Sequence, residues 1–330
     1  MYRSKIIGLG GHVPENVVTN FDLEKLMDTS NEWIVERTGI HERRFVTQPC
    51  GSAELALPAC RGAIKDAGIS KEDIELIIVA TTTPEHQIPG TSSYLQALLE
   101  LAPVPTLDIR VQCSGFIYGL SIADQFIKTG QYKHILVVGV EVQSVGLNLT
   151  TEGRDVAVLF GDGAGAVIVG RSDDESAIMS THLFADGRHA NDLWVDAPVG
   201  YQSPRISKEM LDEHRQYPKM NGRQVFKNAV IRFPEAVITA LETNHWTRED
   251  IKLVIPHQAN LRITEAIAKR LELPLEKVYS NIHKYGNTTA ASVPLAMVDA
   301  RKEGKFSRGD KLILAAFGSG FTWASAAIIW

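Results

Sequence analysis

The sequence predicts an α/β fold made of two similar halves, and two observations support this prediction. Strand-like apolar runs alternate with helix-like segments along the whole chain of 330 residues. A short segment of the first half also returns, with modest changes, in the second half. Alternating strands and helices pack in layers, and repeats at one offset indicate a duplication. We therefore expect two duplicated βα halves packed in layers.

The repeat is short, but it occurs twice at one spacing. Ser70–Ile78 (SKEDIELII) matches Thr247–Ile255 (TREDIKLVI), which sets the repeat offset (247 − 70 = 177). At the same offset, His134–Gly139 matches Lys311–Ala316 (311 − 134 = 177). In the first pair a Ser or Thr stands three residues before an Asp, a variant of the signature that caps a helical turn. One such match is weak, but two at one offset favour a duplication.

Each predicted element has its own signal. Short apolar, β-rich runs predict buried strands, in the order Lys5–Leu9, Leu76–Thr81, Thr106–Arg110, His134–Val142, Ala164–Gly170, Leu253–Pro256 and Lys311–Phe317. Apolar residues at helical spacing predict helices at Ser52–Ala67, Thr91–Leu99, Gly115–Thr129, Gly222–Thr243, Leu261–Leu271 and Thr289–Glu303.

The duplication suggests how the chain is divided. We expect the first half to span residues 1–174 and the second to span residues 175–330. At the repeat offset, position 113 corresponds roughly to position 290, so the starts of two helices are expected to meet at one central site. A polar segment with three prolines, Ala185–Met220, interrupts the second half. A long excursion of this kind is typical of a loop over a site entrance.

Two glycine-rich stretches have part of a nucleotide-binding motif. Gly8–Gly11 follows a strand but lacks the downstream pattern of a dinucleotide fingerprint. Gly161–Gly165 lacks the Lys-Ser/Thr that completes a phosphate-binding loop. We interpret both stretches as places where the backbones of packed layers approach closely.

Composition and charge limit the class of protein. The chain is 44% hydrophobic and 22% charged, which is typical of a soluble globular protein with a large core. A net charge of −5 gives no sign of nucleic-acid binding. The N-terminus lacks the apolar region of a signal peptide, and no apolar run could span a bilayer. We therefore expect a cytoplasmic protein without nucleic-acid or membrane partners.

Cys113 is the first candidate for chemistry. It lies in Val111–Phe116, between a strand-like run and the predicted helix that begins near Gly115. A thiol at a helix N-terminus faces free N–H groups and the positive end of the helix dipole, which favour the thiolate. A lone Cys is more often a small core residue. Cys50 and Cys60 have neither disulfide nor metal spacing, and we interpret them as bystanders in a reducing compartment.

Two further polar residues stand at similar junctions. His257 follows a predicted strand in Pro256–Asn260, and Asn287 follows a glycine in Lys284–Thr289. Taken singly, the histidine is explained as a hydrogen-bonded structural residue and the asparagine as a turn or cap.

Together these three residues resemble a known catalytic set. Cys113, His257 and Asn287, in this order and in these contexts, resemble the Cys-His-Asn triad of the β-ketoacyl-acyl-carrier-protein synthase III family in the thiolase-like superfamily. The resemblance spans nearly the whole chain and includes Asn31–Ile40, Phe160–Ala166, Pro256–Arg262 and Ala316–Trp323. It implies a thiolase-like fold with a layered αβαβα core, a homodimer, and acyl-CoA as a substrate with no resident cofactor or metal.

The resemblance also implies a reaction. Cys113 would take an acyl group from acyl-CoA as a thioester, and malonyl-acyl carrier protein would then lose CO₂ and attack it. His257 Nε2 and the Asn287 amide would donate to the developing oxyanion, each contributing roughly 3 kcal/mol. The backbone N–H groups of Cys113 and Ser319 would serve the Cys113 thioester, although Gly is usual at position 319. The lack of a second Cys in a reactive context favours decarboxylation over deprotonation of acetyl-CoA.

The family's binding residues map onto four groups of positions. Trp33 and Arg154 would stack on the two faces of the CoA adenine, with Arg37 near the phosphates, because indole and guanidinium groups are flat and polarizable. Trp33 has an alternative explanation as a core aromatic. The pantetheine channel would be lined by Phe226, Ala259 and Asn260.

The remaining two groups concern protein partners. A basic surface for acidic acyl carrier protein would consist of Lys227, Arg262, Lys269 and Arg270, the last three on one helical face. A solvated charged face is the alternative. Ile88 would cap the acyl pocket of the neighbouring subunit, where Phe is more usual, and its smaller size suggests branched or longer acyl groups.

Three rival functions remain open on the sequence. A specialised condensing enzyme of the same superfamily would use a longer acyl-CoA or malonyl-CoA for a secondary metabolite. A Cys-His-Asn thioester hydrolase would release acyl groups to water. A non-catalytic acyl-CoA-binding protein would fail to acylate Cys113.

Overall fold

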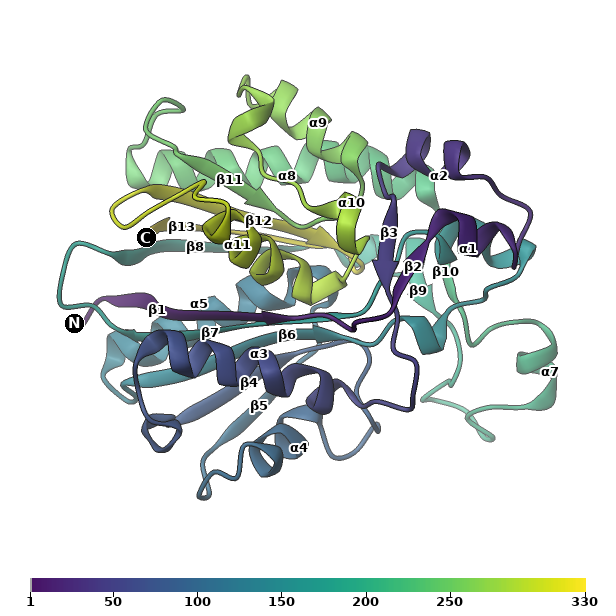
Figure 1. The fold of residues 1–330 in the computed structure, drawn as a ribbon, viewed down its shortest axis with the longest axis horizontal. Coiled ribbons are helices and arrows are strands. Elements are labelled where there is room, and N and C mark those ends of the chain that lie inside the picture. The colour runs from purple at the N-terminus through teal and green to yellow at the C-terminus, as the bar shows by residue number, and fades with distance from the viewer. Residues whose placement is uncertain (1) are drawn as a thin grey trace.

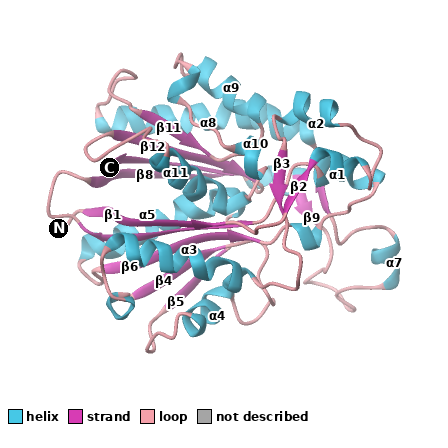
Figure 2. Cartoon of the chain, in the orientation of Figure 1, coloured by secondary structure: helices cyan, strands magenta, loops and turns pink. Residues whose placement is uncertain are grey.

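The structure, a computed structural model of the chain, describes residues 2–330. Two β-sheets lie one above the other with helices between and outside them (Figures 1 and 2). The first sheet has the order β1 (Ser4–His12), β7 (Gly163–Arg171), β6 (His134–Glu141), β4 (Leu76–Ala80) and β5 (Thr106–Ile109). The second sheet has the order β8 (Ala177–Ala185), β13 (Thr322–Ile329), β12 (Lys311–Gly318) and β11 (Leu253–Pro256).

The helices complete five layers. Helices α5 (Gly115–Thr129) and α11 (Ser292–Lys302) lie between the sheets and contact both. The outer face of the first sheet is covered by α3 (Ser52–Ala67) and α4 (Thr91–Leu98). Helix α8 (Gly222–Asn244) covers the second sheet, with α9 (Leu261–Arg270) packed beside it. The predicted layered αβαβα core is confirmed.

Strand register confirms the duplication. Strands β4 and β6 pair in parallel with Leu76 opposite Ile135, and β11 and β12 pair in parallel with Leu253 opposite Leu312. Leu253 follows Leu76, and Leu312 follows Ile135, by the same offset that was found in the sequence (253 − 76 = 177 and 312 − 135 = 177). The strand orders also correspond, since β1-β7-β6-β4 matches β8-β13-β12-β11.

Most predicted elements form within a residue or two of their expected bounds. The helix expected at Thr289–Glu303 begins as a 3₁₀ turn, Thr289–Ala291, and becomes α11 at Ser292. Strands β8 and β13 were not expected from the sequence. The central Ala-Ser-Ala-Ala of β13 has low strand propensity, and this strand forms because it pairs on both sides, with β12 and β8.

Shorter elements surround the end of the molecule where the two halves meet (Figure 1). They are β2 (Val17–Thr19), α1 (Asn20–Glu24), α2 (Asn31–Thr38), β3 (Glu42–Arg44), α6 (Arg154–Ala157), β9 (Leu193–Val195), α7 (Lys208–Asp212), β10 (Pro218–Met220) and α10 (Ile282–Tyr285). The excursion at Ala185–Met220 is therefore not without structure: β9 and β10 pair as a small sheet, and the segment with α7 between them projects outward.

The glycine-rich stretches allow close packing, as expected. A Cβ added at Gly8 would lie 2.2 Å from the carbonyl oxygen of Ala63 in α3. A Cβ at Gly165 would lie 2.6 Å from Pro294 in α11. Both distances are far below van der Waals contact, so only glycine lets these helices lie against the first sheet.

The predicted boundary between residues 174 and 175 falls in the connection between β7 and β8. We propose that residues 1–174 and 175–330 are the two duplicated units. No helix within residues 2–330 is long and apolar enough to cross a membrane.

Candidate active site

Cys113 lies where the two halves touch. It belongs to the 3₁₀ turn Gln112–Ser114 that leads into α5, and it is only 6% exposed. The N–H groups of Cys113 and Ser319 both hydrogen-bond its sulfur. A Cβ added at Gly318 would lie 2.7 Å from the Cys113 Cβ and 3.0 Å from Sγ, so the bare backbone of β12 makes room for the thiol.

The expected thiolate is wrong for the resting state of this site. Burial first and the nearby Glu141 carboxylate second raise the pKa of the Cys113 thiol to about 12, although two backbone N–H groups act in the opposite direction. Desolvation of the charged form thus outweighs the helix dipole. Cys113 is therefore a neutral thiol at neutral pH.

His257 is a neutral, buried imidazole that lines the same cavity as Cys113. It follows β11, is 2% exposed, and burial lowers its pKa to about 3, so the imidazole is neutral. Its Nδ1 lies 2.5 Å from Ser292 Oγ, which in turn lies 2.9 Å from the Thr289 carbonyl oxygen. Because that carbonyl only accepts, Ser292 donates to it and Nδ1–H donates to Ser292. This assignment leaves a lone pair on Nε2.

Asn287 is held so that its amide NH₂ is available. Its backbone N–H donates to Leu159 at 2.8 Å, and its carbonyl accepts from Gly161 at 3.1 Å. Its side-chain Oδ1 accepts from the Thr289 N–H at 2.9 Å. With Oδ1 fixed in this way, Nδ2 is the atom left for a substrate oxygen.

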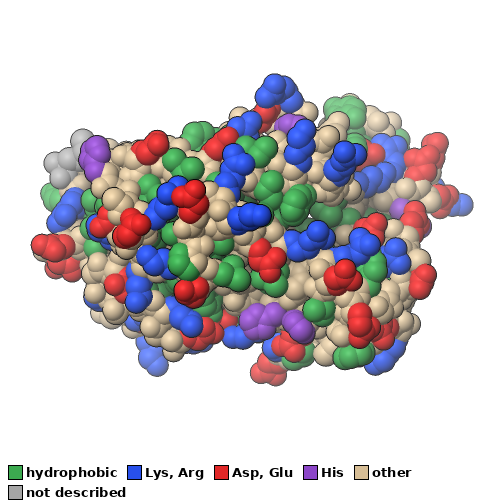
Figure 3. Space-filling view, turned by 90° about the horizontal axis from the view of Figure 1, so that it is seen from above, with side chains coloured by type: hydrophobic (Ala, Val, Ile, Leu, Met, Phe, Trp, Pro, Cys, Tyr) green, Lys and Arg blue, Asp and Glu red, His purple; other side chains and the backbone are tan. Residues whose placement is uncertain are grey.

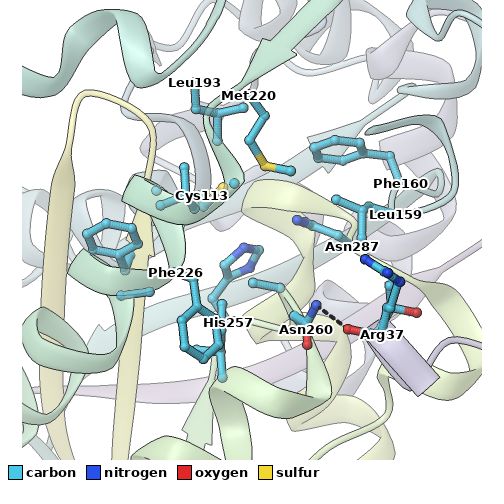
Figure 4. Close-up of a pocket in the computed structure, with 18 of the residues that line it drawn as sticks. Arg37, Cys113, Leu159, Phe160, Leu193, Met220, Phe226, His257, Asn260 and Asn287 are labelled. Carbon is cyan, nitrogen blue, oxygen red and sulfur yellow. Dashed lines mark hydrogen bonds between the residues drawn. The ribbon is translucent and has the colours of Figure 1, made fainter. Parts of the chain in front are cut away.

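One cavity of about 310 Å³ brings the three predicted catalytic residues together. Figure 4 shows Cys113, His257 and Asn287 around this cavity, with Phe226 on one side and Asn260 beside Arg37 on the other. A nucleophilic thiol, a neutral imidazole and an amide donor therefore line one space, which is the set needed for acyl transfer and oxyanion stabilisation.

The predicted adenine site is closed as it stands. The guanidinium carbons of Arg37 and Arg154 each lie 4.7 Å from the centre of the Trp33 ring. This is the spacing of directly stacked groups and leaves no room for another flat ring between Trp33 and Arg154. Arg154 must therefore move if adenine is to enter there. Trp33 itself is half-buried and lines the cavity, so it is not simply a core aromatic.

The predicted channel residues line the same cavity. Phe226 of α8 is 39% exposed and, with Ala259 and Asn260, forms part of the wall. Asn260 also has a structural task, because its Oδ1 caps α9 at Arg262 N–H and its Nδ2 donates to the Arg37 carbonyl at 2.9 Å (Figure 4). It thereby joins α9 to α2 across the cavity mouth.

The predicted basic surface is exposed. Lys227, Arg262, Lys269 and Arg270 are all accessible, and within residues 2–330 none of them forms an ion pair. Figure 3 looks on to the side of the molecule that carries α9 and shows Lys and Arg side chains around a hollow lined by hydrophobic groups.

Ile88 lies elsewhere, in the loop between β4 and α4, and is 86% exposed.

Ser319 has a role that explains its side chain. Its hydroxyl donates to the carbonyl of Leu193 in β9, so the turn that follows β12 is tied to the excursion. Leu193 and Met220, from β9 and β10, line the catalytic cavity. The excursion predicted to lie over a site entrance therefore forms one wall of it.

Glu141 is the residue that sequence reasoning missed. It ends β6 with no exposed surface and accepts hydrogen bonds from the Thr82 N–H, from the Thr82 hydroxyl at 2.7 Å, and from the Thr83 hydroxyl at 3.0 Å. It also accepts from the Ala290 N–H. Burial raises its pKa to about 7. A carboxylate at the end of an otherwise apolar strand was the signal that could have identified it.

Comparison with known proteins shows the family of this chain. Residues 107–187 match the model of the family 3-oxoacyl-[acyl-carrier-protein (ACP)] synthase III, and residues 241–330 match the model of its C-terminal part. A β-ketoacyl-[acyl-carrier-protein] synthase III of Caldanaerobacter subterraneus is 46% identical over 98% of this chain and 97% of its own length.

Solved structures give the same result. The 3-oxoacyl-[acyl-carrier-protein] synthase III of Aquifex aeolicus is 44% identical, covers 99% of this chain and 100% of its own, and has a TM-score of 0.91. A priming β-ketosynthase from the R1128 polyketide pathway is 30% identical, covers 99% of this chain and 96% of its own, and has the same TM-score. Identity at this level over almost the full length is shared only within families, and this chain belongs to the β-ketoacyl-[acyl-carrier-protein] synthase III family.

Proposed function

We propose that this protein condenses an acyl-CoA primer with malonyl-acyl carrier protein to give β-ketoacyl-acyl carrier protein, the step that initiates fatty acid synthesis. The observation that carries the proposal is the single cavity that contains Cys113, His257 and the free Asn287 amide. Family membership supports the same reaction.

Acylation is the first step. Cys113 Sγ attacks the thioester carbonyl of acyl-CoA while His257 Nε2 takes the thiol proton, and the CoA sulfur leaves with that proton. The oxyanion that forms on the carbonyl is bound by the N–H groups of Cys113 and Ser319, which already point at the sulfur. Such preorganised donors lower the barrier because they need no reorientation.

Condensation is the second step. The malonyl group loses CO₂, and the electron pair of the broken C–C bond forms an enolate that attacks the Cys113 thioester. The Asn287 amide and His257 Nε2–H donate to the enolate oxygen. This second state is the other tautomer of neutral His257, in which solvent supplies a proton to Nε2 and accepts the proton from Nδ1. Ser292 supports it, because its hydroxyl hydrogen can turn from Thr289 to donate to Nδ1. The Cys113 thiolate leaves and regains a proton.

The carriers reach the site from the basic face. We assign CoA binding to Trp33, Arg37 and Arg154 at the mouth, and the pantetheine arm to the wall formed by Phe226, Ala259 and Asn260. Acyl carrier protein, which is acidic, docks on Lys227, Arg262, Lys269 and Arg270. No metal or resident cofactor is needed, because decarboxylation itself supplies the carbanion.

The protein acts as a cytoplasmic homodimer in this account. Strand β5 ends the first sheet, so within residues 2–330 its outer edge has no partner strand, and an exposed edge favours pairing with a second copy. Ile88, with 86% of its surface exposed, is available to close the acyl cavity of a second protomer. As a smaller residue than Phe, it admits branched or longer acyl groups.

A condensation assay tests the proposal. Purified protein is incubated with ¹⁴C-malonyl-acyl carrier protein and a set of acyl-CoAs, and both CO₂ release and the mass of the carrier-bound product are followed. We expect a β-ketoacyl product that depends on Cys113. Acyl release to water without malonyl substrate would instead indicate the hydrolase, and product formed only with malonyl-CoA would indicate the specialised condensing enzyme.

A further inference from the structure

A second cavity lies on the other side of Cys113. It has a volume of about 500 Å³, and Cys113, Phe160 and Leu193 line both cavities. Given the proposed function, acyl-CoA reaches Cys113 through the first cavity. The acyl group left on the sulfur then extends into the second cavity, which we call the acyl chamber.

The wall of the acyl chamber carries several polar side chains beside its apolar surface. A chamber for an alkyl chain is normally lined by apolar side chains, because the chain offers no hydrogen bonds. Val195 and Trp194 of β9 form an apolar side here. Much of the rest is formed by side chains with amide, hydroxyl or guanidinium groups, among them Thr82, Arg110, Gln112, Gln143, Gln216 and Thr289.

Some polar side chains of this wall already form hydrogen bonds with one another. Gln143 Nε2 donates to Thr289 Oγ1 at 2.9 Å and to Thr82 Oγ1 at 3.2 Å. Thr82 Oγ1 in turn donates to the Glu141 carboxylate at 2.7 Å. These groups form a hydrogen-bonded network. Both N–H groups of the Gln143 amide donate within it, and the Gln143 amide oxygen is left as an acceptor.

Two other side chains of the chamber take no part in this hydrogen-bonded network. Arg110 follows β5 at the rim of the chamber, and Gln112 immediately precedes Cys113. Neither side chain forms a hydrogen bond or ion pair with any other group in residues 2–330. Gln216 adds an acceptor, since its Oε1 is buried without a hydrogen-bond partner among the described residues. Gln112 and Gln216 are half-buried, so an alkyl chain against them would remove water from their amides without replacing its hydrogen bonds, which is unfavourable; Arg110 is exposed to solvent at the rim.

We propose that the acyl chamber selects a primer whose acyl group carries an oxygen substituent, a hydroxyl or a carboxylate, bound by Arg110 and Gln112. The inference rests on the proposed function and narrows its substrate class. The guanidinium donates to either kind of oxygen, and the Gln112 amide both donates and accepts. A site that hydrogen-bonds a substrate oxygen discriminates strongly against an analogue without it.

The test compares acyl groups of equal length. Acylation of Cys113 is measured as kcat/KM for CoA release from butyryl-CoA, 3-hydroxybutyryl-CoA and succinyl-CoA, with the adduct confirmed by intact mass. At least one oxygen-bearing thioester is expected to react tenfold or more faster than butyryl-CoA. A preference for 3-hydroxybutyryl would identify a hydroxyl ligand, and a preference for succinyl a carboxylate.

Variants locate the preference. Arg110→Leu combined with Gln112→Leu should remove it and make butyryl-CoA the better donor. Arg61→Leu, an exposed arginine of α3 on the outer face of the first sheet, serves as the matched control and should keep the wild-type order. A circular dichroism melting curve checks that the double variant is folded. Retention of the preference in a folded double variant would contradict the assignment to these residues.

The outcomes separate this inference from the proposed function. If butyryl-CoA acylates Cys113 fastest and the product condenses with malonyl-acyl carrier protein, the function stands and the substrate class proposed here is wrong. If no thioester acylates Cys113, both are wrong.

Discussion

Gln112 and Thr289 hold the same left-handed backbone conformation, with φ angles of 44° and 48°, at positions separated by the repeat offset (289 − 112 = 177). Each begins a 3₁₀ turn that leads into a central helix, α5 in one half and α11 in the other. Residues other than glycine rarely adopt this conformation. Its presence at equivalent positions indicates that both halves keep one way of starting the central helix.

The two helix starts differ in the residue that the adjacent strand places against them. At the equivalent strand ends, β6 finishes with Glu141 and β12 with Gly318 (318 − 141 = 177). The Glu141 carboxylate accepts the Ala290 N–H at the start of the second-half turn. Gly318 leaves the corresponding space for the Cys113 thiol. One helix start is thus closed by a buried protein carboxyl group, whose pKa burial raises to about 7, and the other is open for chemistry.

Replacing Gly318 by alanine should abolish acylation. The added Cβ would lie 2.7 Å from the Cys113 Cβ and must displace the nucleophile or the strand. We expect kcat/KM for acyl-CoA to fall at least a hundredfold and the protein to lose about 1–3 kcal/mol of stability. Gly187→Ala, where a Cβ meets no atom within 4 Å, is the control. An active, normally stable Gly318→Ala protein would contradict the packing described.

Neutralising Glu141 should make Cys113 easier to ionise. The Glu141 charge raises the pKa of the thiol, so Glu141→Gln should move the alkaline limb of the acylation rate to lower pH. The variant should also be less stable, because the amide NH₂ cannot accept from the Thr82 N–H or hydroxyl. The measurement is the rate of iodoacetamide alkylation of Cys113 against pH, with melting temperature in parallel. An unchanged profile would show that Glu141 does not act on the thiol.

Burial of neutral His257 should make the protein sensitive to acid. In the unfolded chain this side chain binds a proton below about pH 6.5, whereas in the folded protein its pKa is about 3. Protonation therefore favours the unfolded state, so this contribution to stability is full above pH 6.5. It is lost as the pH falls from 6.5 towards 3, with a total of about 5 kcal/mol.

Urea unfolding at pH 7 and pH 4.5 measures this effect. His257→Asn should lose less stability than the wild type between the two values. His245→Asn is the control, because His245 is exposed and asparagine tolerates its left-handed conformation. An equal loss in the wild type and His257→Asn would show that His257 is not the group that titrates.

Removing the Ser292 hydroxyl should impair chemistry more than binding. Ser292→Ala leaves His257 Nδ1 without its partner at 2.5 Å, so the imidazole loses its fixed orientation and tautomer. We expect kcat to fall roughly 10- to 100-fold with KM for acyl-CoA changed less than threefold. Ser292→Thr, which keeps the hydroxyl, should restore much of the rate. Equal loss in both variants would point to packing rather than to the hydrogen bond.

Reversing charge on the basic surface should affect only the carrier-bound substrate. Lys227→Glu with Arg262→Glu should raise KM for malonyl-acyl carrier protein about tenfold and leave KM for acyl-CoA nearly unchanged. Helix α9 should tolerate Arg262→Glu, since an acidic residue in a first turn complements the helix dipole. Arg61→Glu combined with Lys65→Glu, both exposed on α3, makes the same change in net charge and is the control. A uniform rise in both KM values would contradict a dedicated carrier surface.

The sequence was sufficient for the core of the fold because the signals there are local and repeated. Strands β4 and β11 are continuous apolar runs, and their matching offset predicted that they belong to two duplicated halves. Strand β13 was missed because its alanines and serine gain their strand conformation from pairing with β8 and β12. Such non-local pairing leaves no periodic signal.

The sequence predicted that three candidate residues lie together, but it did not predict the electrostatics around them. The contexts of Cys113, His257 and Asn287 identified them, and one cavity contains all three. The direction of the Cys113 pKa shift was not predictable, because it depends on burial and on Glu141, which ends a different strand beyond helix α5. The closed stack of Arg154 on Trp33 likewise depends on distant segments meeting.

Acylation of Cys113 is the central claim, and intact-mass spectrometry tests it most directly. The purified protein is incubated with acetyl- through decanoyl-CoA, and with hydroxyl- and carboxyl-bearing thioesters, beside Cys113→Ala. The account predicts a mass increase of one acyl group that is absent from the variant and disappears when malonyl-acyl carrier protein is added. An adduct that persists in Cys113→Ala, or no adduct with any donor, would contradict it.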